Sequence, residues 1–405
     1  MSLFRVAASV VNGVGAAARA LGVPAGRLDP AELERAASRS EGHDDFGDPR
    51  FRVGLETLVE SLEADADLHM LGRLHMRALV IELLVTRLRL SRRLAQSRQR
   101  APVSLTPPLL VCGLPRSGTT FLHRMLAIRS DARPLPLWEL REPIPRTNSP
   151  HLGPGAPDPR LALAQARDRR IAELLPESVD AQHLMRAELP DECGHLFKVA
   201  FWSSLFWQVP VYRYLEWYID ADAELPYREY RALLDALAEP GRRLVLKDPF
   251  HAGHLESLLG VLPGAMVVQT HRDPVEIVPS FHKLTTTFQA VLSARVDRER
   301  TVELNTRWLQ TLVRRSADAR PRLEPGRVFD VDYRELVADP FTVVEAIHDH
   351  FGLDFDPAYR ARLTQFIADN PQRKHGPNPY AASDFGQHRD QIAEAFADYR
   401  TRFQR

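Results

Sequence analysis

Lysine is scarce in this chain of 405 residues. Lys198, Lys247, Lys283 and Lys374 are the only lysines, and the rest of the 53 basic residues are arginine. Genome composition is the simplest explanation of such a bias. The bias makes the four lysines informative, because the flexible ammonium of lysine and the planar guanidinium of arginine are not interchangeable at a site that needs one of them. A retained lysine is therefore a candidate for a specific role.

Three further absences exclude classes of protein. The 53 acidic residues cancel the basic ones, so the chain lacks the net basic character typical of nucleic-acid-binding domains. Cys112 and Cys193 are too few for a disulfide framework or a four-thiolate zinc site, which favours a reducing, cytoplasmic location. No stretch reaches the ~20 apolar residues of a transmembrane helix. Asn12, Gly13 and Gly15 interrupt the mildly apolar start, where we expect a short amphipathic helix rather than a signal peptide.

The sequence pattern changes at about residue 105. Residues 1–105 predict a helical extension or cap, in which Asp29 and Pro30 form one helix start and which offers helices for a homo-oligomer. Residues 106–405 alternate short apolar runs with longer helical patterns. This alternation predicts an α/β fold with a parallel central sheet and helices on both faces. An insertion at 134–240, polar at first and then aromatic, separates the first two strand-helix units.

The first predicted strand runs into a turn with two glycines, GLPRSGTT, which begins at Gly113. A strand that enters a helix through such a turn aims several backbone N–H groups at one point, and the helix dipole adds to this anion site. The spacing resembles the P-loop of nucleotide hydrolases. It differs at one position, because Thr119 replaces the phosphate-binding lysine and the loop carries Arg116 instead.

The same string resembles the 5′-phosphosulfate loop of sulfotransferases that use 3′-phosphoadenylyl sulfate (PAPS), and the resemblance extends from about residue 108 to 386. It implies donor-binding roles for Pro115, Arg116, Ser117, Gly118, Thr119 and Thr120. In this family an arginine at the end of a later strand and a serine eight residues on bind the 3′-phosphate, and Arg272 and Ser280 stand at that spacing. Arginine offers phosphate a planar fork of donors, although an Arg-Asp pair at a strand end is also a common surface ion pair.

The string Lys247-Asp248-Pro-Phe resembles tyrosylprotein sulfotransferases, in which the lysine approaches the sulfonate and the bridging oxygen. The resemblance implies a catalytic role for Lys247, together with Arg116, because a flexible ammonium can follow charge that builds on a leaving group. The alternative is a salt bridge between Lys247 and Asp248 at the strand end.

The same resemblance places the general base six residues before Pro145, at Glu139. A carboxylate beside Trp138 can have its pKa raised toward a useful range. Glu142 is a rival. His251 is a second alternative, since cytosolic sulfotransferases use a histidine in this strand region, although this sequence lacks their Lys-Thr-His string.

Weaker signals lie toward the end of the chain. Tyr333 resembles the family's tyrosine near the adenine, or is a core aromatic, and Arg373 and Lys374 resemble a basic segment that closes over the 3′-phosphate. Glu192 lies in a segment where acceptor-binding residues would fall, but we interpret that segment as a solvated helix start. The aromatic run at 197–218 would line an acceptor pocket or, the favoured interpretation, form core.

Together these features predict a PAPS-dependent sulfotransferase that transfers a sulfonate to a hydroxyl by in-line displacement and releases adenosine 3′,5′-bisphosphate. The acceptor would be a small molecule, a lipid or a carbohydrate, and no metal is required because cations of the chain neutralise the charge. Two alternatives stay open. One is a P-loop kinase or NTPase that depends on Mg²⁺, and the other is a non-catalytic interaction protein with a degenerate nucleotide site.

Overall fold

A five-stranded, all-parallel sheet forms the centre of the computed structural model, in the strand order β2-β3-β1-β4-β5. The structure describes residues 10–15, 17, 26–97, 105–146, 158–173, 186–370 and 381–403. The strands are β1 (Leu109–Gly113), β2 (Ala132–Pro134), β3 (Arg243–Lys247), β4 (Met266–His271) and β5 (Val328–Asp332). The predicted α/β class with a parallel sheet is confirmed.

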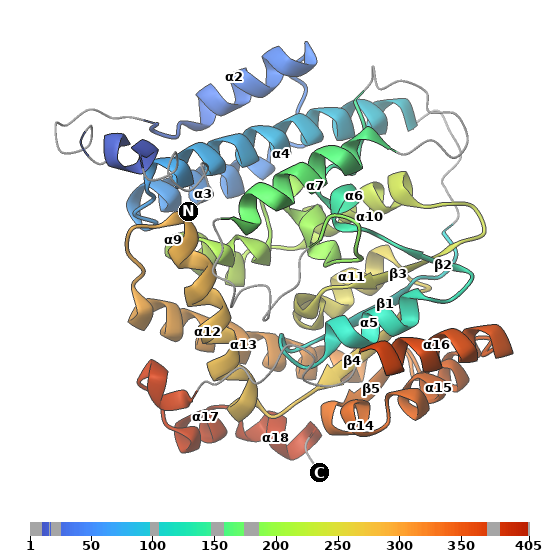
Figure 1. Ribbon diagram of the computed structural model, residues 1–405. Helices are drawn as coiled ribbons and strands as arrows, with labels where there is room; N and C mark the ends of the chain where they lie inside the picture. Colours follow the sequence, from blue (N-terminus) through green and yellow to red (C-terminus); the bar gives the residue numbers. More distant parts are fainter. Residues whose placement is uncertain are drawn as a thin grey trace.

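Alternate residues of the central strand belong to two different apolar cores. Leu109 and Val111 of β1 lie in the smaller core, whereas Leu110 and Cys112 lie in the larger one. Successive side chains of a strand point to opposite faces of a sheet, so each core covers one face (Figure 1). The smaller core is completed by α5 (Thr119–Ala127), α14 (Tyr333–Ala338), α15 (Pro340–Phe351) and α16 (Pro357–Asp369).

The larger core lies on the other face and receives side chains from many more elements. After β3 these are the 3-10 helix η3 (Pro249–His254), α11 (Leu255–Val261), α12 (Pro274–Leu292) and α13 (Arg298–Ala319). The short helix η4 (Arg320–Arg322) leads into β5, and the chain ends with η5 (Ala382–Phe385), α17 (Arg389–Ala395) and α18 (Ala397–Phe403).

The segment between β2 and β3 corresponds to the predicted insertion at 134–240. Its described elements are α6 (Leu137–Arg141), α7 (Pro159–Ala172), the 3-10 helices η1 (Cys193–Ala200) and η2 (Ser204–Gln208), α9 (Tyr212–Asp220) and α10 (Glu224–Leu237). Strand β2 was not predicted. It has only three residues at the edge of the sheet and ends in Pro134, and proline has no N–H to donate to a sheet ladder.

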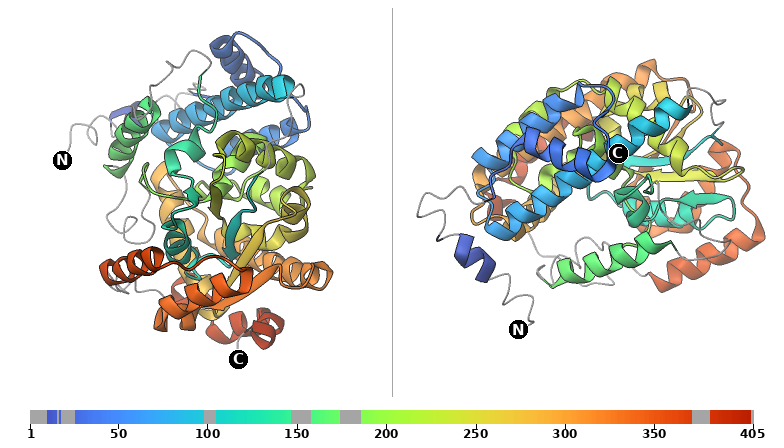
Figure 2. Two further views of the ribbon diagram at one scale, coloured as in Figure 1. Left: turned by 90° about the vertical axis from the view of Figure 1, so that its right-hand side faces the viewer. Right: turned by 90° about the horizontal axis from the view of Figure 1, so that it is seen from above.

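The N-terminal helices are α2 (Pro30–Glu41), α3 (Phe51–Ala64) and α4 (Met70–Ser97). The predicted start of α2 is confirmed, because the side chain of Asp29 accepts the N–H of Glu32 at 2.9 Å and Pro30 is the first helical residue. Figures 1 and 2 show these helices at the end of the molecule opposite to α14–α18. None of the described helices combines the length and the apolarity needed to cross a bilayer.

The N-terminal helices share the larger apolar core with the insertion and the sheet. Leu55 of α3 and Leu84 of α4, for example, belong to the same buried cluster as Phe201 and Leu246. The division into residues 1–105 and 106–405 therefore stays a prediction about folding units, and the structure packs both parts around one core.

A buried ion pair joins the N-terminal helices to the insertion. Both terminal nitrogens of Arg87 on α4 donate to the carboxylate of Glu229 on α10, each at 2.7 Å. The same guanidinium donates to the carbonyl oxygens of Asp48, at 3.0 Å, and Val199, at 3.2 Å. Since the side chain of Arg87 is only 2% exposed, these partners rather than water must compensate its positive charge.

Glu229→Gln should lower the free energy of unfolding by about 3–5 kcal/mol, because it leaves a buried guanidinium without its counter-charge. Chemical denaturation measures the loss. Glu224→Gln on the same helix is the matched control, since its contact with Arg228 at 3.7 Å lies at the surface, and we expect a loss below about 1 kcal/mol. Equal losses in the two variants would contradict a special role for the buried pair.

Candidate active site

The glycine-rich turn lies at the carboxyl edge of the sheet, between β1 and α5. Gly113 has a φ of 141°, and a Cβ at this position would meet the carbonyl oxygen of Thr270 in β4 at 2.4 Å. Arg116 and Gly118 also have positive φ, 67° and 86°. Positive φ is unfavourable for arginine, and such strain concentrates at ligand sites. Where the backbone adopts positive φ, successive N–H groups can point to the same side and form a concave anion-binding site.

The side chain of Ser117 fixes the turn to the sheet. Its hydroxyl donates to the carbonyl oxygen of Leu114 at 2.5 Å and lies 2.6 Å from the hydroxyl of Thr270. Ser117 is completely buried. Any contact of Ser117 with a ligand would therefore be made by its backbone, while its side chain holds the loop in place.

A cavity of about 280 Å³, here called the donor cavity, opens over this turn. Five of the six loop residues predicted to bind the donor line it, namely Pro115, Arg116, Gly118, Thr119 and Thr120. Its other walls include Arg272, Tyr333, Glu192, His195, Trp207 and Gln208. Chain segments far apart in the sequence thus meet at the carboxyl ends of β1, β3 and β4, where ligands bind in open parallel sheets.

Two guanidinium groups, a hydroxyl and an aromatic ring come together on one side of the donor cavity. Arg272 donates to the carbonyl oxygen of Arg116 at 2.9 Å, and its guanidinium carbon lies 4.3 Å from the centre of the Tyr333 ring. Arg116 donates through Nε to the hydroxyl of Ser280 at 3.2 Å. The structure therefore brings together four residues that the sequence predicted to hold the donor.

Lys247, at the end of β3, is completely buried. Its Nζ donates to Oε1 of Glu192 at 2.8 Å, and the side chain of Glu192 is 12% exposed and lines the donor cavity. Lys247 itself lies behind that carboxylate. The interpretation of the Glu192 segment as a solvated helix start is therefore wrong: Glu192 begins η1 as the counter-charge of a buried ammonium.

Asp248 does not form the predicted alternative salt bridge with Lys247. Its carboxylate instead accepts the N–H of Phe250 at 3.0 Å and caps the start of η3. Burial raises the pKa of Asp248 above its ordinary value, and the nearby carboxylate of Glu192 adds to the rise. Lys247 is thus directed toward Glu192, away from its neighbour in sequence.

The predicted general base, Glu139, lies elsewhere. Its carboxylate accepts from Arg133 at 2.5 Å, and Arg133 also pairs with Glu239 at 2.6 Å. The rival Glu142 pairs with Arg89 at 3.0 Å. Neither glutamate lines the donor cavity. The role of Glu139 as base stays a prediction, and its position argues against it.

His251, the other predicted base, is buried behind the site in an aromatic cluster. Its Nδ1 lies 2.7 Å from the hydroxyl of Tyr227, its Nε2 lies 3.4 Å from Sγ of Cys193, and its ring contacts that of Phe197. Burial lowers the pKa of His251 to about 3, with a smaller contribution from His254. Both ring nitrogens face protein groups. The role of His251 as base stays a prediction, and its buried position argues against it.

Arg373 and Lys374, the predicted clasp for the 3′-phosphate, lie outside the described residues. Among the residues that are described, no group of three or more His, Cys, Asp or Glu side chains is arranged to hold a metal ion.

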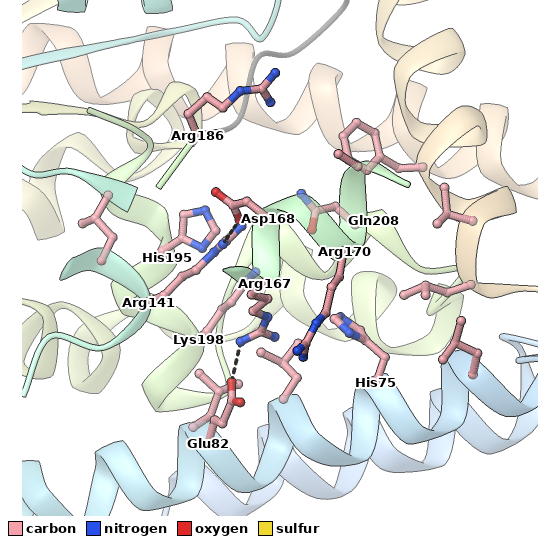
Figure 3. A pocket seen from close by; sticks show the side chains of 18 of the residues that line it. His75, Glu82, Arg141, Arg167, Asp168, Arg170, Arg186, His195, Lys198 and Gln208 are labelled. Carbon is pink, nitrogen blue, oxygen red and sulfur yellow. Dashed lines mark hydrogen bonds and ion pairs between the residues drawn. The ribbon is translucent and has the colours of Figure 1, made fainter. Parts of the chain in front are cut away.

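A second cavity of about 310 Å³, here called the acceptor cavity, adjoins the donor cavity, because His195 and Gln208 line both. Helix α4 presents Leu71, His75, Leu79 and Glu82 to it from one face, and α12 adds Phe288, Val291 and Leu292. Figure 3 shows its polar side chains, most of which come from α4, α7 and η1.

The aromatic run at 197–218 is mostly core, as favoured, and partly cavity wall. Phe201 and Tyr214 are buried in the larger core. Leu205 and Trp207 line the donor cavity, while Val199 lines the acceptor cavity. Both interpretations of this segment therefore hold for different residues.

A sequence model described as "Sulfotransferase family" matches residues 107–357, more than half of the chain. The chain therefore belongs to the sulfotransferase family, as the motifs indicated. Omega-hydroxy-beta-dihydromenaquinone-9 sulfotransferase Stf3 of Mycobacterium bovis and that of Mycobacterium tuberculosis are each 27% identical to it over 139 residues. The match covers 33% of this chain and 34% of each relative, so it spans about a third of the length of these curated proteins.

Solved structures resemble the chain over a much greater length. Sulfotransferase STF1 from Mycobacterium tuberculosis H37Rv is 27% identical, with a TM-score of 0.73, and the likeness covers 92% of this chain and 99% of that one. Sulfotransferase STF9 from Mycobacterium avium is 25% identical, with a TM-score of 0.81 over 92% and 96% of the two chains. The likeness thus extends beyond the segment that the family model matches.

Sequence reasoning assigned no role to three residues of η1 and its cap that reach the two cavities. Glu192, His195 and Lys198 recur at intervals of three, and side chains three apart eclipse one another in a 3-10 helix. Glu192 lines the donor cavity, His195 lines both and Lys198 lines the acceptor cavity. The spacing of three is a signal for this arrangement only if the segment is assumed to form a 3-10 helix. It is not apparent if the segment is assumed to be an α-helix or a loop.

Proposed function

We propose that this protein transfers a sulfonate from PAPS to the hydroxyl of an apolar acceptor. The observation that carries the proposal is the meeting of Arg116, Arg272, Ser280 and Tyr333 around the glycine-rich turn. Membership of the sulfotransferase family supports PAPS as the donor. The adjoining, largely apolar acceptor cavity supports an acceptor with a substantial hydrocarbon part.

The residues around the donor cavity fit a nucleotide that carries phosphate and sulfonate groups. The guanidinium of Arg272 stacks on Tyr333, which gives a flat cationic wall suited to the 3′-phosphate and the adenine ring. The glycine at position 118 allows the Tyr333 ring to lie close to the turn, since a Cβ there would be only 3.1 Å from the ring. The helix start after the turn favours the charge of the 5′-phosphosulfate.

In the proposed reaction the acceptor hydroxyl attacks sulfur while the bond from sulfur to the bridging oxygen breaks. Glu192 takes the proton of the hydroxyl, since its carboxylate lines the donor cavity beside the junction with the acceptor cavity. Protonation weakens the hold of Glu192 on Lys247, whose ammonium then donates to the departing oxygen of adenosine 3′,5′-bisphosphate. Arg116 stabilises the sulfonate oxygens, so that charge is neutralised as it develops.

The acceptor class follows from the cavity and the relatives together. The curated relatives are named for a hydroxylated menaquinone, a lipid, and the leucine-rich face of α4 suits a lipid chain. A lipid alcohol is therefore favoured over the small molecules and carbohydrates that the sequence left open. A cytoplasmic location and a homo-oligomer through the N-terminal helices stay predictions.

Calorimetric titration tests the donor site and separates the proposal from its rivals. We expect adenosine 3′,5′-bisphosphate to bind and ATP with Mg²⁺ not to bind, because Thr119 replaces the lysine of nucleotide hydrolases. Arg272→Ala should weaken the binding by about 10- to 100-fold, the range for a hydrogen bond to a charged group. Binding of ATP alone would indicate a kinase or NTPase, and binding of neither ligand a non-catalytic protein.

Lys247→Ala should lower kcat by about 100-fold or more while the affinity for adenosine 3′,5′-bisphosphate changes little, because Lys247 acts on the leaving group. Lys247→Arg should also lose most activity, since the completely buried position has no room for a planar guanidinium. Steady-state kinetics and calorimetry measure the two effects. Full activity in Lys247→Arg would contradict the role, and equal losses of kcat and affinity in Lys247→Ala would make Lys247 a binding residue.

Glu192→Gln and Glu139→Gln distinguish the two candidate bases. We expect kcat to fall by about 10²- to 10⁴-fold in Glu192→Gln, the usual contribution of a general base, and to change by less than about 3-fold in Glu139→Gln. Single-turnover transfer at saturating donor measures the step directly. The opposite order of effects would return the role to Glu139 and reject Glu192.

A further inference from the structure

The acceptor cavity combines apolar walls with an excess of positive charge. Five of its described lining residues are cationic, namely Arg141, Arg167, Arg170, Arg186 and Lys198, whereas only Glu82 and Asp168 are acidic. Each acidic residue forms an ion pair with an arginine. Asp168 pairs with Arg141 at 2.7 Å and Glu82 pairs with Arg167 at 2.8 Å (Figure 3). A cavity for a wholly neutral lipid would need none of these charges.

Lys198 is the buried cation among these five described lining residues. It is 7% exposed, lines the cavity, and has the ring of Phe206 at 5.8 Å from its Nζ. Within the described ranges no carboxylate pairs directly with its ammonium. A buried charge without a counter-ion is costly, so a structure that keeps one here is suited to a ligand that supplies the opposite charge.

The electrostatic environment of Lys198 agrees with this geometry. Burial, followed by the guanidinium groups of Arg141 and Arg167, lowers the pKa of Lys198 to about 7. Glu192 and Asp191 act in the opposite direction without restoring the ordinary value. An anion placed next to the ammonium would favour its charged form and so oppose the effects of burial and of the two guanidinium groups.

The position of Lys198 fixes where such an anion would lie relative to the reacting hydroxyl. His195, at the junction of the two cavities, precedes Lys198 by one turn of η1, which is a rise of about 6 Å. Beyond Lys198 the wall continues along the apolar side chains of α4 and α12, such as Leu71 and Leu292. A bound chain could therefore place its hydroxyl at the junction and its hydrocarbon part along α4.

We propose that the acceptor is an anionic amphiphile, an alcohol that carries a carboxylate, phosphate or sulfate group near its hydroxyl, and that Lys198 selects it by binding this group. Arg141, already held by Asp168, forms the neighbouring wall of the anion site. Lysine suits this task, since its compact ammonium follows the headgroup of a mobile ligand. The inference rests on the proposed function and gives a role to Lys198, for which the sequence suggested none.

Binding of tetradecanoate and of tetradecanol, to protein saturated with adenosine 3′,5′-bisphosphate, tests the proposal without turnover. Calorimetry should show that tetradecanoate binds about 10- to 100-fold more tightly than tetradecanol, and that Lys198→Met removes this preference. Methionine keeps the length of the side chain in apolar surroundings. Arg169→Met is the matched control, because Arg169 is an exposed cation of α7 that does not line the cavity, and it should keep the preference.

A second test compares the turnover of two acceptors, 6-hydroxytetradecanoate and its primary amide. The wild type should favour the acid in kcat/KM by a similar factor, and Lys198→Met should use both equally. Equal binding of the two probes by the wild type, absence of binding by either, or a preference that survives in Lys198→Met would overturn the proposal. Binding of adenosine 3′,5′-bisphosphate in the same samples reports separately on the proposed function.

Discussion

The ammonium of Lys247 is completely buried at the carboxyl end of the sheet, and a buried charge must have a partner. Glu192 is that partner, at 2.8 Å. The contact holds the start of η1 against the end of β3, although the two residues are far apart in the chain. Because η1 then runs from one cavity to the other, a single ion pair sets the position of the wall that the donor and acceptor cavities share.

This wall joins two sites of different chemistry. On one side the backbone of the glycine-rich turn and the guanidinium groups of Arg116 and Arg272 form a polar, cationic surface suited to a nucleotide. On the other side α4 and α12 offer leucines, valine and phenylalanine. A reaction between a nucleotide and an acceptor with a hydrocarbon part requires such a boundary, since each substrate needs its own surroundings up to the reacting atoms.

Local patterns were sufficient to predict the sheet, four of its strands and the turn at Gly113, because apolar runs, glycines and Asp-Pro helix starts act over a few residues. The resemblance to sulfotransferases, rather than a local pattern, singled out Arg272 and Ser280, and each of them contacts Arg116. The pairing of Glu192 with Lys247 was not predictable in this way, since it depends on how a long insertion folds back onto β3. For the same reason, counting from Pro145 gave Glu139, whose carboxylate the neighbouring Arg133 binds, and the burial of His251 among aromatic rings was not visible in its motif.

The most direct test of the central claim is a single-turnover experiment with PAPS labelled in its sulfonate group and a hydroxylated lipid of the acceptor class. The account predicts that the label moves to the lipid in the wild type and stays on the donor in Glu192→Gln, which still binds PAPS. Transfer at the wild-type rate in Glu192→Gln, or no transfer from PAPS to any hydroxylated lipid by the wild type, would contradict it.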